Sequence, residues 1–98
     1  MPGFRRLMKR NYALTIRGKV QGVGFRYYAL KKAAEHHVAG FVRNMPGQEV
    51  YIVAEGEETD LETFSDHLRI GPSMARVREV LIEKSDYTGS YEGFVVRY

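Results

Sequence analysis

The stretch GKVQGVGFR, residues 18–26, places three glycines just before an arginine, a combination suited to binding an anion. Gly18, Gly22 and Gly24 have no Cβ, so successive backbone N–H groups can turn inward toward one anion. A helix is expected to begin directly after the last glycine, and its N-terminus adds amide donors and partial positive charge. Arg26, in the first turn, adds a guanidinium group that fits phosphate oxygens in a bidentate manner. The stretch is therefore either a phosphate cradle or a structural loop that only turns the chain.

Two familiar phosphate-binding motifs do not fit this stretch. Its glycine spacing is G-x-x-x-G-x-G, whereas the dinucleotide-binding motif is G-x-G-x-x-G. No Gly-Lys-Ser or Gly-Lys-Thr follows, as a nucleotide P-loop requires. A nucleotide-dependent enzyme is therefore disfavoured.

The segments on either side of the stretch have regular hydrophobic periodicity. Tyr12, Leu14 and Ile16 alternate with less apolar residues, which predicts a half-buried strand. A helix is expected over residues 25–37. The apolar side of that helix is expected to consist of Phe25, Ala29, Leu30, Ala33 and Ala34.

The rest of the chain predicts a hairpin, a second helix and two more strands. Thr59 and Glu62 have the spacing of a capping box at the start of a helix, which Gly71 and Pro72 close. The Pro-Gly of MPGQ indicates the hairpin turn. The expected strands are residues 38–44, 49–55, 75–84 with a β-bulge, and 94–98.

This order of elements predicts an α+β, ferredoxin-like split βαβ fold. Four main strands form an antiparallel sheet with both helices on one face, and a short terminal strand follows. We expect one domain over residues 12–98, preceded by a basic lead-in at residues 1–11. The first helix returns the chain across the sheet, so the glycine loop and Asn44, which ends the second strand, are expected at the same rim. A turn residue that opens the hairpin is the other interpretation of Asn44.

Composition excludes several classes of chemistry. The sequence has no cysteine, which excludes disulfides, thiolate catalysis and Cys-ligated metals. His36 and His37 are adjacent on a helix and point about 100° apart, so they cannot both face one metal. No apolar run approaches the roughly 18 residues of a membrane span, and no secretory signal is recognised, so we expect a cytoplasmic protein without membrane contact.

The net charge of +3 mildly favours anionic ligands but does not by itself indicate nucleic acid. RNA-recognition domains share this order of elements and need exposed aromatic residues on the central strands. Residues 49–55 offer only Tyr51 and carry Glu49 and Glu55, which repel phosphates. We therefore expect no nucleic-acid partner.

Two motifs resemble those of the acylphosphatases. The stretch GKVQGVGFR resembles their signature G-x-V-Q-G-V-x-F-R, and GFVRN, residues 40–44, resembles their second motif G-[FW]-V-x-N. The ending FVVRY is also similar to the usual terminus of the family. The resemblance covers residues 12–98, with one departure: Gly47 and Gln48 stand where the family commonly has Asp-Gly in the hairpin turn.

The resemblance implies hydrolysis of the carboxyl-phosphate anhydride of an acyl phosphate, without metal or cofactor. It implies that Arg26 binds the phosphoryl group and that Asn44 holds the attacking water. Inorganic phosphate would be both product and inhibitor, and we expect a monomer. The alternative is a non-catalytic phosphate-binding regulatory module of the same fold. The phosphate-binding residues that the resemblance implies are Gln21, Gly22, Val23, Gly24, Phe25 and Arg26.

Overall fold

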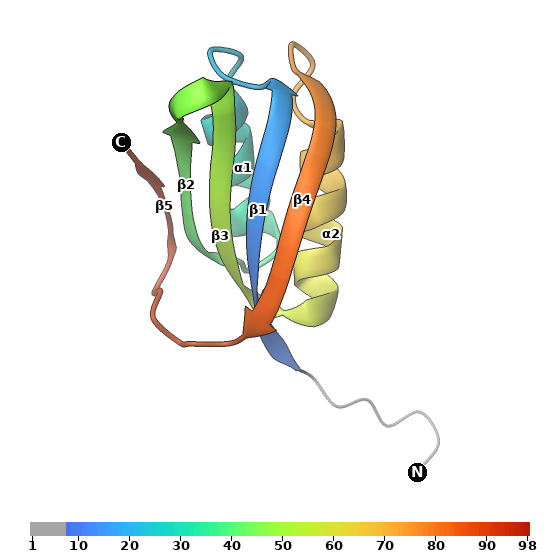
Figure 1. Ribbon diagram of the computed structural model, residues 1–98. Coiled ribbons are helices and arrows are strands. Elements are labelled where there is room, and N and C mark those ends of the chain that lie inside the picture. Colours follow the sequence, from blue (N-terminus) through green and yellow to red (C-terminus); the bar gives the residue numbers. More distant parts are fainter. Residues whose placement is uncertain (1–7) are drawn as a thin grey trace.

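The computed structural model describes residues 8–98 as a five-stranded sheet with both helices on one face (Figure 1). The strand order across the sheet is β4-β1-β3-β2-β5. The elements are β1 (Lys9–Lys19), α1 (Phe25–Glu35), β2 (Ala39–Met45), a 3-10 turn (Pro46–Gln48), β3 (Glu49–Glu57), α2 (Glu58–Ile70), β4 (Arg76–Asp86) and β5 (Phe94–Arg97). The expected lead-in falls largely on residues 1–7, outside the described residues, and β1 begins at Lys9 rather than at the expected Tyr12.

The predicted ferredoxin-like arrangement is confirmed for the four main strands, β1 to β4, which pair with one another only in antiparallel fashion. The terminal strand differs, because β5 pairs with β2 in parallel and makes the complete sheet mixed. The alternation expected in β1 is also confirmed: Tyr12, Leu14 and Ile16 are completely buried under the helices. They join a single core with the inward residues of β3 and both helices.

Helix α1 buries a narrower stripe than its sequence predicts. Phe25, Ala29 and Ala33 are buried as expected. Leu30 is only half-buried and Ala34 is exposed, so the core does not cover the whole of the apolar side that the periodicity predicts. The physical reason is that both side chains border open pockets beside β5 instead of facing the closed part of the sheet.

The predicted capping box of α2 is wrong, although its C-terminal end is confirmed. The helix begins at Glu58 and no side chain caps it. The backbone N–H of Glu58 instead donates to the carbonyl of Met8, at 2.8 Å, so the residue just before β1 supplies the acceptor. At the other end, Gly71 has a φ of 72° and closes the helix as expected.

A β-bulge lies where β1 meets β4, as expected for this strand. Arg17 pairs with Glu79 and the next residue, Gly18, pairs with Val77, which leaves Arg78 unpaired. A Cβ on Gly18 would lie 2.0 Å from the carbonyl oxygen of Arg76. Gly18 is therefore required for the close approach of two strands, and its expected place in the anion-binding loop is wrong.

The buried carboxylate of Glu55 holds the segment that leads to β5. Its oxygens accept hydrogen bonds from the side chain of Asn11, from the backbone and hydroxyl of Thr88 and from the backbone of Gly89. Burial raises the pKa of the Glu55 carboxyl, but these hydrogen bonds outweigh it, and the net pKa lies below the usual range. This anchor fixes the start of the loop that delivers β5 to the edge of β2.

Candidate active site

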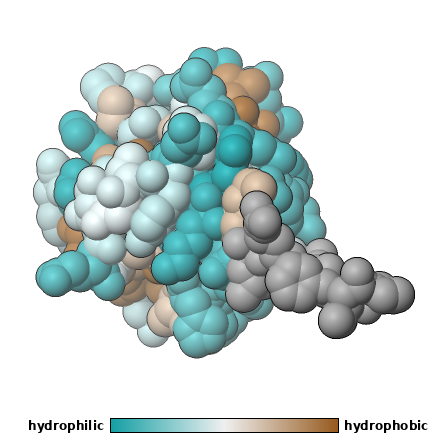
Figure 2. Space-filling view, turned by 90° about the horizontal axis from the view of Figure 1, so that it is seen from below, coloured by the Kyte–Doolittle hydropathy of each residue, from teal (hydrophilic) through white to brown (hydrophobic). Residues whose placement is uncertain are grey.

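The glycine loop between β1 and α1 lies at the same end of the sheet as the β2–β3 turn (Figure 1). The common direction of β1 and β2 explains this, because both pair antiparallel to β3 and therefore end at one rim. Figure 2 views the molecule from the opposite end, where the visible surface is mostly hydrophilic with small separate hydrophobic areas. Because β1 and β2 end at the same rim, the glycine loop and Asn44 lie at the end of the sheet that the sequence predicted.

The backbone of the glycine loop alternates in the sign of φ, the pattern that is typical of an anion-binding nest. Gly22 and Gly24 have φ angles of 73° and 79°, in the left-handed region, while Val23 between them does not have a positive φ. Alternation of this kind points successive N–H groups to one side. Gly24 is also the N-cap of α1, where its carbonyl accepts the first helical hydrogen bond, from the N–H of Tyr28, at 3.0 Å. The nest and the positive end of the helix therefore coincide.

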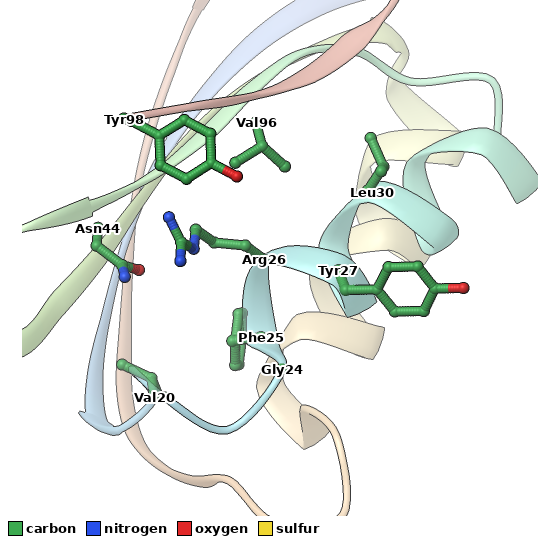
Figure 3. Close-up of a pocket in the computed structure, with 10 residues that line it drawn as sticks. Val20, Gly24, Phe25, Arg26, Tyr27, Leu30, Asn44, Val96 and Tyr98 are labelled. Carbon is green, nitrogen blue, oxygen red and sulfur yellow. The ribbon is translucent and has the colours of Figure 1, made fainter.

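Arg26 and Asn44 line one pocket of about 300 Å³ (Figure 3). The guanidinium of Arg26 points toward the amide of Asn44, which comes from β2. Within residues 8–98, no carboxylate forms an ion pair with Arg26. The guanidinium Cζ lies 5.0 Å from the centre of the Tyr98 ring, a cation-π contact that leaves its N–H groups available. The pocket therefore offers an unneutralised cation beside a neutral amide.

The loop and the hairpin turn are joined by the side chain of Gln21. Its Nε2 donates to the carbonyls of Met45 and Glu49, both at 2.8 Å. Met45 directly follows Asn44, so this pair of hydrogen bonds sets the position of the amide relative to the loop. The side chain of Gln21 does not line the pocket, and neither does Val23, which packs against the core. The other four expected loop residues, Gly22, Gly24, Phe25 and Arg26, all line it.

The turn after Asn44 contains two consecutive residues with positive φ. Gly47 and Gln48 have φ angles of 80° and 67°, and the latter is rare for a residue with a side chain. The carbonyls of Met45 and Glu49, on either side of this turn, are the acceptors for Gln21. The tie between the loop and the turn is therefore in place although Gly47 and Gln48 depart from the common turn sequence.

Sequence reasoning missed the apolar part of the pocket. Tyr27 lies just beyond the motif that ends at Arg26, and no role in the site was predicted for it or for the terminal FVVRY. The neighbouring Tyr28 does not line the pocket: its hydroxyl donates to the carbonyl of His67, at 2.9 Å, and burial raises its pKa. The apolar residues that line the pocket are Val20, Phe25, Tyr27, Leu30, Val96 and Tyr98.

The histidines lie away from this pocket. The rings of His36 and His67 stack with their centres 5.2 Å apart, which joins the two helices. Among residues 8–98, no three His, Asp or Glu side chains gather in a way that could hold a metal ion. None of the helices in this part of the chain has the length and apolar character needed to cross a membrane.

Comparisons with known proteins agree with the site. The family model for acylphosphatase matches residues 12–96. The chain is 40% identical over 91 residues to an acylphosphatase of Geotalea uraniireducens, covering 93% of this chain and 100% of the relative. It is 44% identical over 89 residues to an acylphosphatase of Thermus thermophilus, covering 91% and 99%. The crystal structure of acylphosphatase from Bacillus subtilis matches with a TM-score of 0.88 and 31% identity, covering 91% of this chain and 99% of that one. The glycine loop, the arginine at the start of α1 and the asparagine of β2 thus occur in a chain that belongs to the acylphosphatase family.

Proposed function

We propose a division of roles among Arg26, the loop amides and Asn44 in the hydrolysis of acyl phosphates, the reaction that family membership assigns to this chain. Water attacks phosphorus, the bond between phosphorus and the bridging oxygen breaks, and a carboxylate and inorganic phosphate leave. The carboxylate is a good leaving group, so no strong general acid is required. The work that remains is positioning and stabilisation of charge on the phosphoryl oxygens.

Arg26 and the amides of residues 21–26 bind the phosphoryl group. A guanidinium without a carboxylate partner keeps its charge for the substrate, and its planar fork matches two phosphoryl oxygens. The nest at Gly22 and Gly24 and the N-terminus of α1 add amide donors directed at the same group. These donors act in the transition state, where negative charge on the equatorial oxygens must be stabilised.

Asn44 holds the attacking water. Its side-chain amide both donates and accepts, so it can bind a water and a phosphoryl oxygen together. A carboxylate at this position would repel the dianionic substrate. Because the amide is neutral, it orients the water without adding charge to the pocket.

One observation supports this assignment most strongly: the Arg26 guanidinium and the Asn44 amide line one pocket, and none of the described Asp or Glu residues lines it. The same site would accept inorganic phosphate as a competitive inhibitor. We further propose that the reaction needs no metal, that the protein acts as a monomer and that it works in the cytoplasm.

The test is hydrolysis of benzoyl phosphate in the presence of a chelator, with inhibition by inorganic phosphate measured in parallel. We expect turnover that the chelator does not reduce and competitive inhibition by phosphate. Phosphate binding without turnover would instead support a non-catalytic regulatory module, an alternative that the named relatives do not favour. Gel filtration of the same sample tests the monomer.

A further inference from the structure

The pocket that contains Arg26 and Asn44 has a second, apolar half that the phosphoryl chemistry does not use. Leu30 is half-buried on α1, one turn beyond Arg26, and Val96 is half-buried on β5. In Figure 3 both lie on the opposite side of Arg26 from Asn44, while the Tyr98 ring lies over the guanidinium, next to Val96. We call Leu30, Val96 and the Tyr98 ring the apolar shelf.

The geometry of phosphoryl transfer indicates what the shelf faces. The attacking and leaving oxygens lie roughly in line through phosphorus. If the water is on the Asn44 side, the bridging oxygen and its acyl group must extend to the other side of the phosphoryl group. Leu30 and Val96, the two aliphatic residues of the shelf, lie on that side (Figure 3).

The reach from the cradle to the shelf discriminates between acyl groups. Leu30 follows Arg26 by four residues, which corresponds to about 6 Å along the helix axis. An acetyl group ends one methyl carbon beyond its carbonyl, whereas a benzoyl ring extends several ångströms further. The larger acyl group can therefore cover the shelf, and the smaller one cannot.

The apolar surface continues beyond Leu30. A neighbouring pocket of about 470 Å³ shares this residue and lies between α1 and the start of β5. Most of its lining is apolar or small, including Ala33, Val38 and Phe94. The groove beside β5 therefore has room for an acyl chain longer than the benzoyl group.

We propose that the apolar shelf binds the acyl group and makes this enzyme select aromatic and longer aliphatic acyl phosphates over acetyl phosphate. The inference rests on the proposed function, because it requires the phosphoryl group in the cradle and the water on Asn44. The shelf residues determine specificity and take no part in bond breaking. Removal of apolar area from water supplies the preference.

The test compares kcat/KM for benzoyl phosphate and acetyl phosphate in the wild type and in Leu30→Asn and Val96→Thr. The wild type should favour benzoyl phosphate by about tenfold or more, and each variant should reduce that ratio several-fold, mainly by raising KM for benzoyl phosphate. Leu81→Asn is the matched control, since Leu81 is 43% exposed on β4 and does not line either pocket. It should leave the ratio unchanged.

A binding measurement separates failure of the shelf from failure of the proposed function. Benzylphosphonate and methylphosphonate have a P–C bond in place of the P–O bond that breaks, so the enzyme cannot hydrolyse them. Their affinities for the wild type can therefore be measured without turnover and without a variant. Tighter binding of benzylphosphonate supports the shelf. Equal affinities, or equal kcat/KM for the two acyl phosphates, overturn it while the hydrolytic function stands. Absence of turnover on both acyl phosphates overturns the proposed function and, with it, the selection of substrates.

Discussion

Replacing Gln21 with methionine should slow catalysis without weakening phosphate binding to the same extent. The substitution keeps the length of the side chain and removes the two hydrogen bonds from Nε2 to the carbonyls of Met45 and Glu49, each 2.8 Å long. At about 1 kcal/mol each, these bonds stabilise the tie between loop and turn by about 2 kcal/mol. A free energy of about 1.4 kcal/mol corresponds to a factor of ten. If all of the roughly 2 kcal/mol serves to position Asn44, its loss should lower kcat by about 30-fold.

The assay is steady-state hydrolysis of benzoyl phosphate, with the inhibition constant of inorganic phosphate and a urea unfolding curve for each variant. Gln21→Met should lower kcat by about ten- to 30-fold, while phosphate inhibition changes by no more than about twofold. Tyr28→Phe is the control, because it removes a hydrogen bond to the carbonyl of His67 outside the pocket. It should lower stability by about 1 kcal/mol and leave kcat unchanged. If Gln21→Met, like Tyr28→Phe, lowers stability and leaves kcat unchanged, the hydrogen bonds of Gln21 do not position Asn44.

Three further predictions concern the loop, the amide and the acid limit of stability. Gly24→Ala should lower stability by about 1–2 kcal/mol, because the φ of Gly24 is 79°, and it should also weaken inhibition by phosphate. Gly89, with a φ of 70°, lies far from the pocket, so Gly89→Ala should lower stability and leave phosphate inhibition unchanged. Asn44→Ala should lower kcat more than phosphate affinity, and an equal loss in both would contradict its role in holding water. The pKa of Glu55 is lowered in the folded state, so its stabilising contribution is complete above the usual Glu pKa of about 4.3 and is lost as pH falls through the folded value. Urea unfolding measured from pH 7 to acid should therefore show a smaller loss of stability in Glu55→Gln than in the wild type, and identical slopes would refute this.

The overall fold and the rim that carries the site could be predicted because both depend on short-range patterns and simple topology. Alternation identified β1, and the direction of β1 and β2 then required the glycine loop and Asn44 to meet. No knowledge of side-chain contacts was needed for this step. The same reasoning failed at Leu30, because helical periodicity gives the apolar side of α1 and not the part of that side that the sheet covers.

Other features depend on contacts between distant residues, which local patterns do not encode. The capping box failed because the acceptor for the N–H of Glu58 is the carbonyl of Met8, 50 residues earlier and just before β1. Gln21 was predicted only as a phosphate-binding residue of the loop, whereas the acceptors of its side chain are carbonyls 24 and 28 residues away in the sequence. Gly18 was assigned to the nest because sequence shows that a glycine is present and not which neighbour requires it.

The central claim is that the uncompensated charge of Arg26 binds the phosphoryl group, and kcat/KM of Arg26→Ala for benzoyl phosphate tests it most directly. Loss of a charge-assisted contact worth about 2–4 kcal/mol predicts a fall of about 30-fold to a thousandfold. Stability should change little, because within the described residues Arg26 forms no ion pair and contacts the exposed Tyr98 ring. A folded variant with the turnover of the wild type would contradict the claim.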